Sequence, residues 1–261
     1  MATSKKRNAR GTSTKLRAPT KGMDIVMNID EQITTMLTSH GVCDVGFAKV
    51  PDGPSDMMYA ISIVIPLCDA IIDEIENVPT YSYFHHYRTV NAYIDHLLLK
   101  VGLLLQSKGY CYIPIAASQS NPTDGNRTHM GRYSHKKAAV LAGLGYIGKS
   151  TLFLHRAYGP RVRLGTVFTD CPLPVSELVP PSICKDCNLC VKSCPSGAIK
   201  GIEWQEGIQR NEMFDADACN GYMRDHFMNI GRGSVCGICI KVCPQNQIQK
   251  LNYKTYRSEN Y

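Results

Sequence analysis

Four closely spaced cysteines constrain this chain more than any other feature of its sequence. Cys184, Cys187, Cys190 and Cys194 follow the pattern C-x2-C-x2-C-x3-C, and Pro195 comes directly after the last of them. This spacing is typical of a tight loop whose thiolates ligate a cubane 4Fe–4S cluster. In chains with two clusters the fourth cysteine ligates the other cluster, so the pattern predicts a second set of ligands. A helix is expected to begin at the fourth cysteine, with Pro195 in its first turn.

A second run of cysteines lacks one thiolate. Cys236, Cys239 and Cys243 keep the spacing C-x2-C-x3-C before a proline, but Gly233 stands where the first cysteine belongs. Cys219, upstream of this run, is the nearby cysteine that can replace it. The sequence therefore predicts two 4Fe–4S clusters, one ligated by Cys184, Cys187, Cys190 and Cys243 and the other by Cys194, Cys219, Cys236 and Cys239.

Structural zinc is the alternative interpretation of these cysteines. Paired C-x2-C segments also bind zinc. A zinc ion with four ligands does not require the longer spacing C-x2-C-x2-C-x3-C, however, so this spacing favours the clusters. The other cysteines stand singly in apolar or strand-like segments, where we expect buried small side chains: Cys43, Cys68, Cys111 and Cys171. Clusters and reduced thiols need a reducing compartment, so a cytoplasmic location is expected.

The net charge of +7 lies in one terminal segment. Residues 1–22 contain seven of the 29 Lys and Arg and no acid, which leaves 22 basic against 22 acidic residues elsewhere. This segment predicts a disordered basic tail, with Met23 as an alternative start. A targeting peptide or a nucleic-acid arm has the same composition. The remaining body is neutral and lacks an apolar run of membrane length, so neither nucleic acid nor a membrane is an expected partner.

Residues 23–178 alternate helical and strand-like segments, which indicates an α/β or α+β domain. The helical segments are 29–40, 69–76, 85–108 and 135–142, and the strand-like segments are 42–50, 60–67, 111–117, 151–155 and 162–169. The proline-rich stretch 172–183 is a natural linker. Beyond it we expect a cluster-binding domain over 179–250 and a C-terminal tail over 251–261.

The segment GLGYIGKS satisfies two nucleotide-binding patterns at once. Gly143, Gly145 and Gly148 fit G-x-G-x-x-G, and the same stretch with Lys149 fits G-x4-G-K-S. Both patterns need a strand before the loop and a long helix after it. Here the preceding residues look helical and the following ones strand-like. The alternative is a glycine-rich turn whose backbone closely approaches a cofactor or the cluster domain.

Five segments resemble, in the same order, those of the epoxyqueuosine reductase family: GLGYIGKSTLF, GPRVRLGTVFTD, CKDCNLCVKSCPSGAI, a lone cysteine and CGICIKVCP. The resemblance covers roughly 23–248, and that family shares its core with the reductive dehalogenases. It implies a nitroreductase-like α/β (α+β) domain that binds a base-off corrinoid, followed by a bacterial ferredoxin-like module with two 4Fe–4S clusters. Electrons would pass through the clusters to cobalt; a flavin is the alternative cofactor.

The chain departs from this family where a proton donor is expected. Family members that act on queuosine carry an acid about 14 positions before the GLG turn, and here that position is His129. His129 can donate a proton near neutral pH, or it is a histidine of a surface loop. The chain is also shorter than tRNA-acting members with C-terminal repeats, so queuosine-containing tRNA is not the expected substrate.

A group of aromatic, histidine and arginine residues opens the long helical segment and suits a large conjugated or anionic ligand. Packing of a helix start by aromatic side chains is the alternative. The expected cofactor contacts are Gly143, Gly145, Gly148, Lys149, Tyr87 and Arg163.

Two functions follow. One is an oxidoreductase that takes electrons from a donor such as ferredoxin or flavodoxin and reduces a small or nucleoside-like substrate. The other is an electron-transfer protein that serves a partner enzyme.

Overall fold

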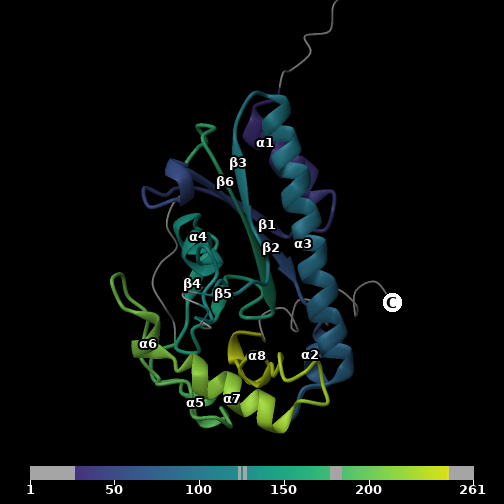
Figure 1. Ribbon diagram of the computed structural model, residues 1–261, viewed down its shortest axis with the longest axis vertical. Helices are drawn as coiled ribbons and strands as arrows, with labels where there is room; N and C mark the ends of the chain where they lie inside the picture. Colours follow the sequence, from purple (N-terminus) through teal and green to yellow (C-terminus); the bar gives the residue numbers. More distant parts are fainter. Residues whose placement is uncertain (1–26, 123–124, 126–127, 177–183, 247–261) are drawn as a thin grey trace, which may run out of the picture.

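The computed structural model describes residues 27–122, 125, 128–176 and 184–246 (Figure 1). The predicted tails 1–22 and 251–261 lie outside the described residues, as does the second half of the predicted linker, 177–183.

An antiparallel four-stranded sheet forms the centre of the fold, in the order β1-β2-β6-β3. Its strands are β1 (Asp44–Lys49), β2 (Tyr59–Pro66), β3 (Tyr112–Ile115) and β6 (Val162–Thr169). Every neighbouring pair is antiparallel, so of the two fold classes predicted from the sequence α+β describes the domain. The continuous apolar run of β2 is buried over six consecutive residues, because helices cover both faces of the sheet.

Helices pack on both faces of this sheet. The helices of this part are α1 (Ile29–Thr38), α2 (Asp69–Asp73), α3 (Tyr81–Ser107) and α4 (His135–Leu141), with a short 3-10 turn η1 (Pro54–Asp56). Ile61 and Ile63 share a hydrophobic cluster with α1 and α3, whereas Ala60 and Val64 share one with α4. The strand alternation thus divides the core into two layers. In Figure 1, α3 runs along one side of the molecule and α4 lies across the sheet from it.

The long helix α3 begins four residues before the predicted start at 85. Thr80 is the reason, because its side-chain oxygen accepts a hydrogen bond from the backbone N–H of Tyr83 (3.0 Å) and caps the helix. The extra turn carries Tyr83 and Phe84 into the region where the cluster-binding module packs.

The segment GLGYIGKS forms part of a hairpin. Strand β4 (Gly145–Ile147) pairs with β5 (Phe153–His155), and α4 precedes them. The phosphate-loop alternative is therefore wrong, since a strand does not lead into the segment and no long helix follows it here. The prediction of a turn that permits close backbone approach agrees with this hairpin.

The module over 184–246 is built from short helices. They are α5 (Leu189–Lys192), α6 (Arg210–Met213), α7 (Ala216–His226), α8 (Ile238–Lys241) and the 3-10 turn η2 (Pro244–Asn246). The predicted helix starting at Cys194 is wrong. The helix α5 instead contains Cys190 and ends before Cys194, because Pro195 disfavours helical geometry in the residue before it.

The module shares the larger hydrophobic cluster with α1 and α3. Ile230, Val235, Ile238 and Ile240 belong to that cluster together with residues of the sheet. In Figure 1 the module lies at one end of the sheet, with α8 beside α2. Burial of this shared apolar surface fixes the module against the start of α3.

Two of the four isolated cysteines differ from the prediction that they are buried. Cys171 is buried and Cys43 is half-buried, but Cys68 and Cys111 are exposed. Cys68 directly precedes α2, and Cys111 directly precedes the edge strand β3, where one side faces solvent. Within the described part of the chain, every helix is too short or too polar to cross a membrane.

Candidate functional site

The thiols of the first predicted cluster lie near one another. Burial raises the pKa of Cys243 to about 11, and the nearby thiols of Cys184, Cys190 and Cys187 contribute to the increase. Burial also raises the pKa of Cys190, with further contributions from Cys184 and Cys187. Cys243 is distant in sequence from the other three, so the fold brings it to them.

The second predicted set forms its own group. Burial raises the pKa of Cys219 to about 11, followed by the effects of Cys236 and Cys194. Cys239 is half-buried, and its raised pKa has desolvation as the main cause and Cys236, Cys219 and Cys194 as the next ones. Cys194 thus interacts with the second group although it ends the first sequence motif, which favours the predicted exchange of ligands between the motifs.

The chemistry of these donors fits iron–sulfur clusters. Buried thiols resist ionisation, and bound metal compensates the cost of forming buried thiolates. Among the described residues, no three His, Cys, Asp or Glu side chains are arranged to hold a single metal ion. Thiolates around a cubane lie further apart than those around one ion, so the grouping of four thiols suits a cluster.

The GLGYIGKS hairpin lies against the loop of the first group. A Cβ atom added to Gly148 would stand 3.3 Å from Cys184 Sγ. Lys149 Nζ donates to the carbonyl oxygen of Lys185 and lies 3.4 Å from Asn188 Oδ1. The predicted cofactor residues Gly148 and Lys149 therefore contact the cysteine loop of 184–190. Gly143 ends α4 with a left-handed backbone, and Gly145 pairs with His155 in the hairpin.

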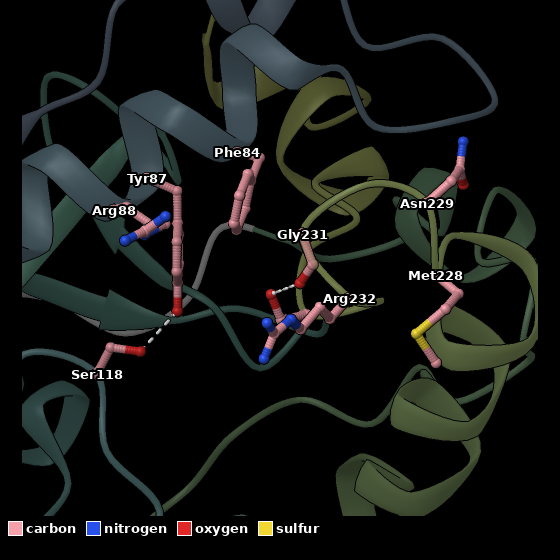
Figure 2. Close-up of a pocket in the computed structure, with 9 residues that line it drawn as sticks. Phe84, Tyr87, Arg88, Ser118, Met228, Asn229, Gly231 and Arg232 are labelled. Atoms are coloured by element: carbon pink, nitrogen blue, oxygen red, sulfur yellow. Dashed lines mark hydrogen bonds between the residues drawn. The ribbon is translucent and has the colours of Figure 1, made fainter.

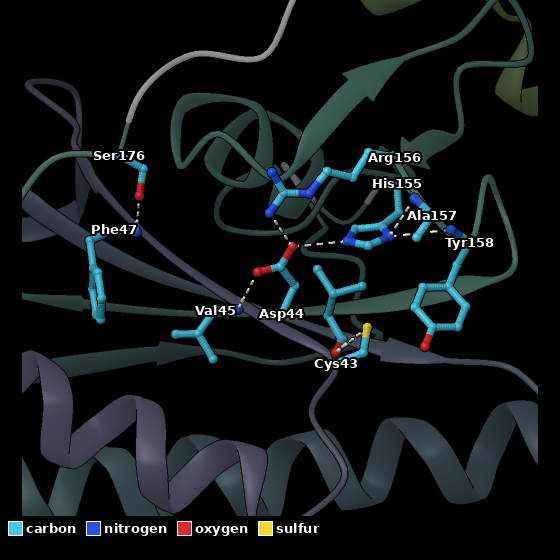
Figure 3. Close-up of polar contacts among 10 residues, drawn as sticks. Cys43, Asp44, Val45, Phe47, His155, Arg156, Ala157, Tyr158 and Ser176 are labelled. Atoms are coloured by element: carbon cyan, nitrogen blue, oxygen red, sulfur yellow. Dashed lines mark hydrogen bonds and ion pairs between the residues drawn. The ribbon is translucent and has the colours of Figure 1, made fainter.

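The other strand of the hairpin is anchored to β1 by a buried histidine (Figure 3). His155 is 5% exposed, and its Nε2 lies 3.1 Å from Asp44 Oδ2. The backbone N–H groups of Ala157 and Tyr158 donate to His155 Nδ1, so the proton of the neutral ring is on Nε2 and faces Asp44. Arg156 donates to the same carboxylate oxygen at 2.9 Å. This contact holds the hairpin in place, and the sequence analysis did not identify it.

A cavity of about 650 Å³ lies where the start of α3 meets the loop 228–234 (Figure 2). It is lined by Phe84, Tyr87, Arg88, Ser118, Met228, Asn229, Gly231, Arg232 and Ser234. The walls combine aromatic rings with donors of hydrogen bonds, and none of these nine residues is acidic. An adjoining cavity of about 360 Å³ shares Met228, Arg232 and Ser234 and adds Arg224. Both cavities therefore favour an anionic or polar, partly planar ligand.

Two of the predicted cofactor residues meet at this cavity. Tyr87 lines it, and its hydroxyl pairs with Ser118 Oγ at 2.7 Å. Arg163 Cζ lies 4.5 Å from the centroid of the Tyr87 ring, and Arg163 Nε donates to Asn91 Oδ1 at 2.8 Å. Arg163 therefore supports the wall from behind, whereas Gly143, Gly145, Gly148 and Lys149 do not line the cavity.

The cavity lies close to the second group of cysteines. A Cβ atom on Gly237 would stand 2.8 Å from Tyr83 Cε1, so the segment between Cys236 and Cys239 contacts the first turn of α3. Burial raises the pKa of Tyr83, and the thiols of Cys239 and Cys236 add to this increase. Tyr83 directly precedes Phe84, which lines the cavity, so this group of cysteines lies close to the cavity.

His129 lies at the module but not in the cavity. Its Nε2 is 3.1 Å from Asp217 Oδ1 on α7, and its carbonyl oxygen accepts a hydrogen bond from Arg210 at 2.6 Å. Its side chain is 20% exposed. The pair links the loop before α4 to the helix that carries Cys219.

Sequence reasoning missed the loop 228–234 as a cavity wall. Gly231, Arg232 and Gly233 have positive φ angles of 60°, 58° and 64°. The Gly-Arg-Gly sequence was a usable signal, since glycines around an arginine permit a left-handed loop that presents its side chain.

Comparison with known families agrees with the cysteine pattern. Residues 183–246 match a 4Fe-4S double cluster binding domain. The chain is 34% identical over 125 residues to the epoxyqueuosine reductase of Pseudomonas aeruginosa, which is 44% of this chain and 32% of that protein. It is 32% identical over 118 residues to the tetrachloroethene reductive dehalogenase of Sulfurospirillum multivorans, 41% of this chain and 22% of that one. The matches thus span a third or less of these curated relatives.

Solved structures with the same fold belong to the same two groups of proteins. A crystal structure of epoxyqueuosine reductase matches with a TM-score of 0.58 and 18% identity, over 84% of this chain and 67% of that one. A reductive dehalogenase, for which a mechanism of B12-dependent dehalogenation has been suggested, matches with a TM-score of 0.66 and 19% identity, over 91% and 36%. The predicted resemblance and the mixed helix and sheet fold are confirmed. The chain thus contains a 4Fe-4S double cluster binding domain and, over part of its length, is similar to epoxyqueuosine reductases and reductive dehalogenases, with which it shares its fold.

Proposed function

We propose that this chain passes electrons through two 4Fe–4S clusters to a cofactor in the cavity and reduces a small or nucleoside-like substrate there. The observation that supports this proposal best is that the cavity and the cluster-binding module lie against each other. Ser234 lines the cavity and lies two residues before Cys236, and Tyr83, the neighbour of the lining residue Phe84, lies against Gly237. Clusters move single electrons, so a cofactor at this wall would be within reach of the nearer cluster.

The ligands of this nearer cluster are Cys194, Cys219, Cys236 and Cys239 in our proposal. The more distant cluster is held by Cys184, Cys187, Cys190 and Cys243. The thiol of Cys190, which belongs to the other set, also raises the pKa of Cys239, although less than Cys236, Cys219 and Cys194 do. This proximity supports two adjacent clusters. An external donor such as ferredoxin or flavodoxin would reduce the distant cluster first. Eight reduced thiolates also support a cytoplasmic location, where disulfides rarely form.

A corrinoid is the cofactor that we favour. The hydrogen-bond donors that line the cavity suit the carboxamide groups around a corrin ring. None of the nine lining residues is a histidine, which agrees with binding that uses no histidine as lower ligand. When bound, a corrinoid supplies the reductive chemistry at cobalt. The protein's part is to orient it, with Tyr87 and Phe84 as flat walls.

A flavin is the second candidate for the same cavity. Arginine and tyrosine beside an aromatic wall also suit an isoalloxazine ring with a phosphate group. The two candidates differ in their optical spectra and in their metal content. Equilibrium titration of the anaerobic protein with cobalamin and, separately, with flavin mononucleotide distinguishes them.

The alternative function is electron transfer to a partner enzyme. The position of His129 favours it, because the predicted proton donor pairs with Asp217 and does not line the cavity. A bound cofactor together with substrate reduction would exclude this alternative. Reduced clusters without binding of cobalamin or flavin at saturating concentration would favour it and contradict our proposal.

A further inference from the structure

Lys149 is a buried lysine whose ammonium group the proposed reaction does not use. The residue is only 7% exposed, and its Nζ contacts two neutral acceptors, the Lys185 carbonyl oxygen and Asn188 Oδ1. Among the residues that the structure describes, no carboxylate lies within ion-pair distance of it. A buried charge is costly without an opposite charge nearby, so a compensating negative group is expected.

The loop that Lys149 holds is the one that begins the first cysteine motif. Cys187 N–H donates to the carbonyl oxygen of Cys184 at 2.8 Å and closes a tight turn. Lys185, inside this turn, has a φ of 39°, which is unusual for a residue with a side chain. Such a conformation persists only where the surroundings fix it. The hydrogen bond from Lys149 to the Lys185 carbonyl oxygen is one such contact.

Gly148 explains why the lysine can come so close. A Cβ atom at this position would lie 2.6 Å from Leu154 Cδ1 and 3.3 Å from Cys184 Sγ. A side chain here would therefore separate the hairpin from the cysteine loop. Gly148 thus lets the backbone of the hairpin approach the sulfur of Cys184, and Lys149 places a positive charge beside the loop 184–190.

We propose that Lys149 positions the loop 184–190 and raises the reduction potential of the cluster held by Cys184, Cys187, Cys190 and Cys243. This inference rests on the proposed cluster ligands, but not on the identity of the cofactor in the cavity. A 4Fe–4S cluster with four thiolates carries a net negative charge, which grows by one on reduction. A nearby ammonium group in a site of low dielectric constant therefore stabilises the reduced form more than the oxidised form.

The test is a redox titration of the reconstituted protein, followed by EPR, with iron content measured in parallel. Lys149→Met removes the charge and keeps the length of the side chain. Lys185→Met is the matched control, because its side chain is exposed on the same loop and solvent screens its charge. Lys149→Arg keeps the charge and serves as the conservative variant. The signal that Cys243→Ser removes identifies the cluster concerned.

We expect Lys149→Met to shift the potential of that cluster to a more negative value, while the other cluster and the Lys185→Met protein keep the wild-type values. Lys149→Arg should stay closer to wild type. Loss of about half of the iron in Lys149→Met alone, with the other cluster intact, would also support the positioning role. Unchanged potential and iron content, or equal effects of the two lysine variants, would overturn the inference. A wild-type protein without two cluster signals would instead overturn the cluster assignment, so the two failures are distinguishable.

Discussion

The guanidinium carbon of Arg163 lies 4.5 Å from the centre of the Tyr87 ring and supports it from behind. Arg163 is itself held by Asn91, a buried residue of α3, through a hydrogen bond of 2.8 Å. The hydroxyl of Tyr87 pairs with Ser118, which also lines the cavity. A strand, a helix and a loop thus fix one aromatic wall, and a rigid wall reduces the entropy lost when a ligand binds.

Replacing Arg163 should weaken binding of the cofactor. Arg163→Met removes the contact with the Tyr87 ring, worth about 1–2 kcal/mol in a partly desolvated site. We therefore expect the dissociation constant of the cofactor to rise about 5- to 30-fold. Absorbance titration with cobalamin measures it. Arg132→Met is the control, since Arg132 is exposed and does not line the cavity; equal binding by both variants would contradict the role of Arg163.

Cys219 should be needed for one cluster only. The wild-type chain is expected to hold about eight iron atoms, and Cys219→Ser about half of that number. Cys68→Ser is the matched control, because Cys68 is exposed and lies outside the predicted ligand sets. Iron analysis and EPR of the reduced protein measure the outcome. Full iron content in Cys219→Ser would show that another group completes the second set.

The contact between Arg161 and α2 should stabilise the junction with the module. Arg161 is 3% exposed and donates to Asp69 and, at 2.7 Å, to Asp73. Lys241 on α8 lies 3.2 Å from the same Asp73 oxygen. Arg161→Met leaves the two carboxylates without this partner, and we expect unfolding to become easier by about 3 kcal/mol.

Denaturant unfolding of Arg161→Met measures this effect, with exposed Lys108→Met as the control for loss of a positive charge. Both carboxylates are partly exposed, so the expected cost is at the lower end for a broken buried pair. A change no larger than that of the control would mean that solvent replaces the contact.

Asp44 should contribute to stability in a pH-dependent way. Burial alone raises its pKa, but hydrogen bonds from His155 and Arg156 outweigh burial, and the net pKa is lower than usual. A carboxyl whose pKa is lower in the folded state stabilises the fold fully above its unfolded pKa of about 4. This contribution disappears as the pH falls through the lower, folded value.

Asp44→Asn should therefore cost about 2 kcal/mol at neutral pH and little in acid. Unfolding free energies between pH 7 and pH 3 measure the difference from wild type. Asp225→Asn, at an exposed position of α7, is the control and should follow the wild-type curve. A constant difference between Asp44→Asn and wild type across this range would argue against the ion pair.

Much of the sheet could be predicted because its pattern is local. The run AISIVIPL predicts a strand buried on both faces, and β2 is that strand. The stripe of Leu97, Leu98, Val101 and Leu105 predicts α3, and these residues are buried. The start of α3 was missed because the capping Thr80 precedes the periodic pattern.

The parts that could not be predicted depend on contacts between distant segments. A three-residue strand such as β4 is too short to show an alternating hydrophobic pattern. The segment therefore matched nucleotide-binding patterns, and the sequence did not reveal the hairpin. The cavity joins Phe84 and Tyr87 to Arg232, and only tertiary packing brings them together. The two cysteine sets stay a prediction, which the sequence permits because a cluster needs four thiolates and counting them singles out Cys219.

The central claim is that the clusters deliver electrons to a corrinoid in the cavity. The most direct measurement is EPR of the anaerobic protein, with about eight iron atoms per chain, incubated with cobalamin and then reduced. We predict two interacting cluster signals and a cobalt signal of the base-off form, which weakens in Arg163→Met but not in Arg132→Met. Free, base-on cobalamin at saturating concentration beside two intact clusters would contradict the claim.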